Sequence, residues 1–72
     1  MSGGLKKRSV AIAGHRTSIS LEPEFWEALL RMAEARALPL AALVAEVDRG
    51  RGGRNLSSAL RVAVLRWVSS DT

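Results

Sequence analysis

The stretch Ser18-Ile19-Ser20-Leu21 runs directly into Glu22-Pro23-Glu24-Phe25-Trp26, and this junction decides the fold. Ile19 and Leu21 alternate with polar residues, which predicts a half-buried strand. Pro23 suits the first turn of a helix because its missing N–H costs no hydrogen bond there, and the neighbouring glutamates favour the positive end of the helix dipole. The polar face of the strand is expected to carry three residues: Arg16, Ser18 and Ser20.

The size of the chain predicts association. Its 72 residues can hold one domain, which alone would bury too little surface for comfortable stability. The sequence has no cysteine and no obvious metal cluster, so neither disulfides nor zinc can replace a core. We therefore expect a homodimer or tetramer. If two copies pair their strands antiparallel, the resulting ribbon is of a size that enters a DNA major groove.

The chain is expected to consist of a basic, partly disordered arm at residues 1–8 and a single domain at residues 9–72. The predicted class is mainly α with a short β-ribbon. The expected elements are a strand at about 16–22, helices at about 23–37, 39–49 and 56–69, and a basic glycine loop at 50–54. Pro39 suits the start of the second helix, and Asn55 or Ser57 can cap the third.

The segment before the strand has two interpretations. In the first, Gly14-His15 forms a two-residue hairpin turn with glycine at positive φ, which pairs Val10 with Ile19 and Ile12 with Thr17. In the second, the earlier segment is an arm and the strand stands alone.

Charge favours a polyanionic partner. The net charge is +4, and residues 1–20 contain four basic side chains and no acidic one. No stretch has the length of a membrane span or of a signal-peptide apolar region, which favours a cytoplasmic protein without membrane contact. His15 is the only histidine. We therefore expect no enzyme activity, no catalytic residue, no metal and no cofactor.

The order of strand, helix, sharp turn and helix resembles the ribbon-helix-helix superfamily, the MetJ/Arc type of dimeric DNA-binding protein. The segments at 7–29, 40–47 and 55–62 look like a bacterial subgroup of small stand-alone members. The resemblance implies a homodimeric transcriptional regulator that inserts an antiparallel β-ribbon into the major groove of double-stranded DNA. It also implies that Arg16, Ser18 and Ser20 read base edges.

The resemblance further implies phosphate binding at the start of the superfamily's second helix. Colinear alignment makes this helix 39–49, with Pro39 where a capping serine or threonine is usual. A second alignment starts it at Asn55 and treats 39–54 as an insertion. The colinear alignment is preferred, and it makes the chain a ribbon-helix-helix dimer with an additional C-terminal helix. The expected phosphate contacts are Lys6, Lys7, Arg8, Leu40, Ala41, Arg51 and Arg54. The expected dimer core is Ile19, Leu21, Phe25, Leu29, Leu43, Leu60, Val64 and Trp67.

A second function remains open. The same dimer could use its apolar third helix to hold another protein, as antitoxin relatives do with their carboxy-terminal segments. Leu60, Val64 and Trp67 would then be the anchors.

Overall fold

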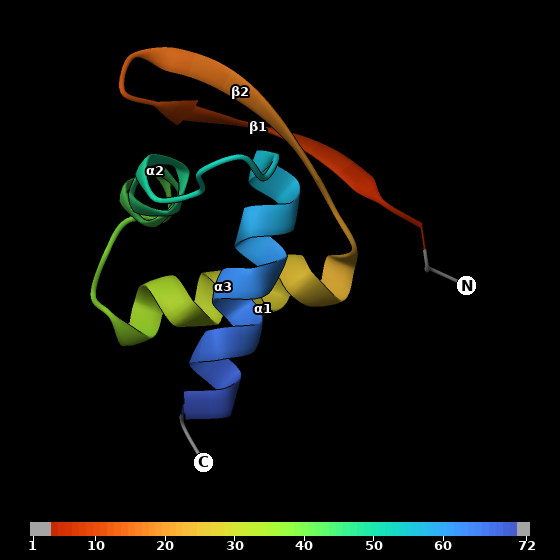
Figure 1. Cartoon of the computed structure of the whole chain (residues 1–72), viewed down its shortest axis with the longest axis vertical. Coiled ribbons are helices and arrows are strands. Elements are labelled where there is room, and N and C mark those ends of the chain that lie inside the picture. Colours follow the sequence, from red (N-terminus) through yellow and green to blue (C-terminus); the bar gives the residue numbers. More distant parts are fainter. Residues whose placement is uncertain (1–3, 71–72) are drawn as a thin grey trace.

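The computed structural model describes residues 4–70, and the first three residues of the expected arm lie outside it. Two strands precede three helices (Figure 1): β1 (Lys6–Ile12), β2 (His15–Leu21), α1 (Pro23–Ala35), α2 (Leu40–Arg49) and α3 (Leu56–Ser70). The strands form an antiparallel hairpin along one side of the molecule, and the helices pack beneath it. The predicted class, mainly helical with a short β-ribbon followed by three helices, is confirmed.

The ribbon is built within one chain. β1 pairs with β2 along its whole length, from Lys6 opposite Leu21 to Ile12 opposite His15. β1 occupies one edge of β2, so the expected pairing of β2 with a second copy would use the other edge, and that pairing stays a prediction. The hairpin also places Lys6, Lys7 and Arg8 in a strand, where an arm was expected.

The hairpin forms, but its register differs from the predicted one. The two turn residues are Ala13 and Gly14, so Val10 lies opposite Thr17 and not opposite Ile19. Both turn residues have positive φ, 51° for Ala13 and 83° for Gly14. Two-residue turns of this kind favour glycine at the second position, and this choice leaves His15 free to extend the strand.

Helix α1 begins as its sequence indicates, with Pro23 in the first turn after Glu22. It ends at Ala35, two residues before the expected limit. Ala37 takes a left-handed φ of 55°, its N–H donates to the Glu34 carbonyl, and the Leu38 N–H donates to the Ala33 carbonyl. These two bonds satisfy carbonyls at the end of the helix and terminate it.

The two later helices start differently. α2 follows Pro39 and has no side-chain cap. α3 follows Asn55, whose Oδ1 accepts a hydrogen bond of 2.8 Å from the Ser58 N–H. Asn55 is therefore the N-cap, one of the two candidates that the sequence offered.

The core lies between the hairpin and the helices. Its largest fully buried side chains are Ile19, Leu21, Leu29, Leu43, Val44 and Leu60. Every element contributes to the cluster, β1 through Val10 and Ile12. Trp67 and Phe25 pack against it while remaining half-buried. Burial of this apolar surface is the main force that holds the hairpin onto the helices.

Candidate nucleic-acid interface

The outward face of β2 carries the predicted row. Arg16 and Ser18 are exposed and Ser20 is half-buried, while Ile19 and Leu21 on the opposite face are each 1% exposed. Successive side chains of a strand point to opposite faces, so burying the two apolar residues turns the three polar ones outward.

A second row on β1 completes this face. Lys7, Ser9 and Ala11 are exposed, whereas Val10 and Ile12 beside them are buried. The register sets Lys7 opposite Ser20, Ser9 opposite Ser18 and Ala11 opposite Arg16. Directly opposite residues share one face of a sheet. We call these six residues the polar face of the hairpin.

The start of α3 lies beside this face. A shallow hollow is lined by Leu5, Ser18 and Ser20 from the hairpin side and by four residues at the start of α3: Asn55, Leu56, Ser57 and Arg61. The Ser20 N–H donates to Ser57 Oγ at 3.2 Å, and Arg61 Nη2 donates to the Ser20 carbonyl at 3.5 Å. These bonds cover the outer edge of β2 near Ser20.

Arg61 links the hairpin to the start of α1. Its Nε lies 3.1 Å from Glu22 Oε1. The pKa of Glu22 is lowered from its ordinary value, first by a backbone hydrogen bond at its own position and then by the hydrogen bond from Arg61. The ion pair leaves Arg61 partly neutralised, so it adds less positive potential to the hollow than a free arginine would.

The three basic residues of β1 lie in different surroundings. Lys6 and Lys7 are exposed, and Lys7 lies on the polar face. Arg8 points to the other side, with its guanidinium carbon 4.5 Å from the centre of the Trp26 ring. Its Nη1 is buried and has no hydrogen-bond partner within residues 4–70. Arg8 is thus held against α1 by a cation–π contact and is poorly placed to meet a phosphate.

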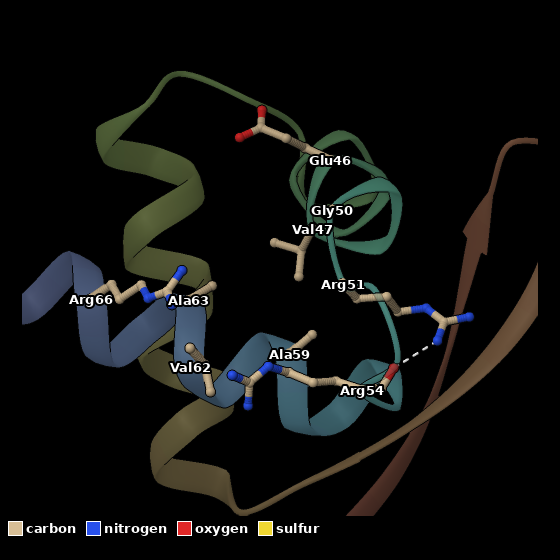
Figure 2. A pocket seen from close by; sticks show the side chains of 9 residues that line it. All are labelled: Glu46, Val47, Gly50, Arg51, Arg54, Ala59, Val62, Ala63 and Arg66. Carbon is tan, nitrogen blue, oxygen red and sulfur yellow. Dashed lines mark hydrogen bonds between the residues drawn. The ribbon is translucent and has the colours of Figure 1, made fainter.

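The basic loop forms a second, separate cluster. A cleft between α2 and α3 is lined by Arg51, Arg54 and Arg66, together with Glu46 and small or apolar side chains (Figure 2). Arg51 donates to Asp48 Oδ1 and to the Arg54 carbonyl, both at 2.7 Å. Figure 2 shows the side chains of Arg54 and Arg66 lying along α3, whereas the Arg51 side chain points the other way and bonds to the Arg54 carbonyl. Of the two predicted phosphate contacts, only Arg51 has its guanidinium engaged in an ion pair within residues 4–70, so Arg54 is the better placed to bind a phosphate.

The starts of α2 and α3 lie in different places relative to the polar face of the hairpin. Leu40 and Ala41, the predicted phosphate contacts of the colinear alignment, begin α2, which packs against β1, and neither lines the hollow beside the polar face. The α3 start does line it. The sequence could not show this, because it depends on how α3 packs against β2, although Asn55 as a cap was a visible signal.

The residues predicted to form a dimer core lie in the core of the single chain. Five of them, Ile19, Leu21, Leu29, Leu43 and Leu60, are 0–1% exposed. Val64 is 5% exposed, and the two aromatic residues are half-buried. Side chains this deeply buried have almost no surface left for a second copy. The large apolar side chains that remain exposed are Leu5, Leu30, Leu65 and Val68.

Two other features bear on function. Within residues 4–70, no group of three or more histidine or carboxylate side chains is placed to hold a metal ion. None of the described helices is long and apolar enough to cross a membrane.

Comparisons with known proteins agree with this architecture. A family model described as the ribbon-helix-helix domain matches residues 5–68. The structure is similar to that of an uncharacterized protein from Bordetella pertussis Tohama I, with 29% sequence identity and a TM-score of 0.75. The match covers 94% of this chain but only 58% of that protein. A comparison with curated proteins gave no match. Because the family model spans both strands and most of α3, this chain belongs to the ribbon-helix-helix domain family.

Proposed function

We propose that the protein is a homodimeric, DNA-binding transcriptional regulator that inserts the polar face of its hairpin into the major groove. The ribbon-helix-helix family is one of DNA-binding proteins. The observation that carries the proposal is the outward row of Arg16, Ser18 and the half-buried Ser20, on a strand whose other face buries Ile19 and Leu21. We place the activity in the bacterial cytoplasm, where the chromosome lies, and assign it no catalytic residue and no cofactor.

The reading chemistry follows from these side chains. The Arg16 guanidinium can donate two hydrogen bonds to O6 and N7 of one guanine, the commonest specific contact in the major groove. The hydroxyls of Ser18 and Ser20 donate or accept and therefore discriminate less between bases. Most of the sequence preference is thus expected to come from Arg16.

Phosphate contacts are proposed beside this surface. Lys6 is exposed at the start of β1, and the first turn of α3 offers backbone N–H groups at Leu56 and Ser57 with the positive end of the helix dipole. We infer that α3 is the second helix of the superfamily and that 39–54 is an insertion, because α3 begins beside the ribbon. Leu40, Ala41 and Arg51 then become weaker candidates than Arg54.

Dimerisation is proposed through side chains that one chain leaves uncovered. Leu65 on α3 is 63% exposed, Val68 one turn later is 50% exposed, and Leu30 on α1 is 43% exposed. A second copy covering them would add the burial that a domain of this size lacks. Light scattering distinguishes a monomer from the expected dimer and from a tetramer.

Capture of another protein by α3 is less well supported. Two of its three expected anchors, Leu60 and Val64, are 0% and 5% exposed, so they cannot be offered to a partner without unfolding the core. Only the half-buried Trp67 retains accessible surface.

Arg16→Ala tests the proposal. Gel shifts would compare a duplex selected by the wild-type protein with a scrambled duplex, at low salt and across a salt series. Losing the bidentate contact should remove about 1–3 kcal/mol of discrimination. The matched control is Arg31→Ala, because Arg31 is an equally charged and exposed residue on α1. Unchanged discrimination in Arg16→Ala would refute the assignment of the polar face as the reading surface.

A further inference from the structure

The cleft between α2 and α3 contains two arginines that have no acidic partner. Arg54 and Arg66 both line it and are both exposed. Within residues 4–70 neither guanidinium forms an ion pair. Figure 2 shows the two side chains reaching toward each other along α3 from opposite ends, with Val62 and Ala63 between them. The two positive charges therefore face the same short stretch of the cleft.

The other charged side chains of this cleft are already neutralised. The Glu46 carboxylate accepts two hydrogen bonds from the Arg36 guanidinium, at 2.8 and 3.0 Å. The pKa of Glu46 is lowered, first of all by this hydrogen bonding. Arg51 pairs with Asp48 Oδ1 at 2.7 Å. Glu46 thus cannot neutralise Arg54 or Arg66 while it remains paired with Arg36, and the cleft keeps an excess of positive charge.

The floor of the cleft is apolar and small. It is formed by Val47 of α2 and by Ala59, Val62 and Ala63 of α3, and all of these except Ala59 are only half-buried. The space above them is about 180 Å³. A cavity of about 150 Å³ is large enough to bind benzene, whereas sites for drug-sized ligands begin near 300 Å³. The apolar body of a ligand that fits here is therefore about the size of one six-membered ring.

We propose that this cleft binds a small organic acid. Its carboxylate would accept hydrogen bonds from Arg54 and Arg66, because guanidinium groups match the geometry of carboxylates. Its apolar body would cover the floor between the two helices. An inorganic phosphate or a DNA phosphate would satisfy the arginines but leave the floor in water, and an uncharged hydrocarbon would leave the arginines unpaired. The inference does not depend on the proposed DNA binding.

The test is a titration of the isotopically labelled full chain, followed by backbone NMR shifts. The probe is benzoate, which has one ring and one carboxylate. Benzyl alcohol keeps the ring without the charge, and inorganic phosphate keeps the charge without the ring. Benzoate should produce saturable changes at Val47, Val62 and Ala63 with a Kd on the order of 1 mM, as expected for a ligand of so few atoms. Benzyl alcohol and phosphate should bind at least about tenfold more weakly.

Three variants assign the charge to the cleft. Arg54→Ala and Arg66→Ala should each weaken benzoate binding about tenfold, since each removes one charged hydrogen-bond donor. Arg31→Ala is the matched control, because Arg31 is an exposed arginine on α1 outside the cleft, and it should leave the affinity unchanged. Unshifted hairpin resonances in each free variant show that the fold is intact.

The outcomes separate this inference from the proposed function. Equal affinity for benzoate and phosphate, or no saturable change with benzoate in the millimolar range, would overturn the inference. If in addition Arg54→Ala and Arg66→Ala weaken duplex binding in gel shifts, the two arginines serve DNA phosphates and the proposed function stands. Selective benzoate binding by a protein that binds no duplex at low salt would support the inference while the proposed function fails.

Discussion

Replacing Ala13 by asparagine should stabilise the protein, because Ala13 is held in an unfavourable conformation by the hairpin turn. Its φ is 51°, in the left-handed region, and the following Gly14 has a φ of 83°. A left-handed conformation costs an ordinary L-residue about 1–2 kcal/mol, and asparagine tolerates it better than alanine. Asn-Gly is also the favoured pair for this turn. We expect Ala13→Asn to raise the free energy of unfolding by about 0.5–1 kcal/mol.

Thermal unfolding followed by circular dichroism measures this effect. A change of 1 kcal/mol shifts Tm by about 4–8 °C in a domain of this size, so the expected rise is about 2–8 °C. Scans must be run at one protein concentration, since the Tm of a dimer depends on it. Ala37→Asn is the positive control, because Ala37 also has a left-handed φ, 55°, but ends a helix. Ala11→Asn is the negative control, because Ala11 is an exposed strand residue.

One pattern would refute the reasoning. If Ala37→Asn raises Tm while Ala13→Asn leaves it unchanged or lowers it, residues 13 and 14 do not form this turn in solution. The ribbon would then not be an intramolecular hairpin.

Three further predictions concern stability. Leu60→Ala should lower the free energy of unfolding, measured by chemical denaturation, by about 2–5 kcal/mol, because Leu60 is fully buried. Leu65 is 63% exposed, so Leu65→Ala should change the same quantity by no more than about 0.5 kcal/mol in a monomeric state. Asn55→Ala should cost about 1 kcal/mol by removing the α3 cap, and an unchanged midpoint would contradict that role. The pKa of Glu22 is lowered in the fold, so its contribution is present above the ordinary carboxyl value of 4.5 and lost as the pH falls through the folded-state value. Acid unfolding curves of Glu22→Gln should therefore lose part of this dependence, and the same dependence in both proteins would exclude Glu22 as its source.

The strand-to-helix junction was predictable because local patterns determine it. Ile19 and Leu21 alternate with polar residues, and burying them leaves only one arrangement of the outward row. Pro23 marks the first turn of α1 independently of any tertiary contact.

The hairpin register was harder to predict because two overlapping two-residue turns, Ala13-Gly14 and Gly14-His15, share the same glycine. Gly14 takes positive φ in either one, so glycine alone does not distinguish Ala13-Gly14 from Gly14-His15. The choice depends on which neighbour accepts the second left-handed position, and the observed turn assigns it to Ala13. A shift of this kind keeps the apolar residues on one face, so the hydrophobic pattern does not distinguish the registers either.

The remaining differences arise from contacts between elements distant in sequence. Arg8 was expected to contact phosphate, but it lies on the same face of β1 as Val10 and Ile12, and its guanidinium packs over the Trp26 ring. The start of α3 lies beside Ser20 because Ser57 and Arg61 bond to that residue. No local pattern encodes which helix approaches the strand edge, so the sequence left both alignments of the second helix open.

The most direct test of the central claim is a map of which residues meet DNA. Backbone NMR shifts of the isotopically labelled protein would be followed while a selected duplex is added at low salt. We predict the largest changes along the polar face of the hairpin, including Arg16 and Ser18, and at the start of α3. Changes confined to the cleft that contains Arg54 and Arg66, with the hairpin resonances unmoved, would contradict the account.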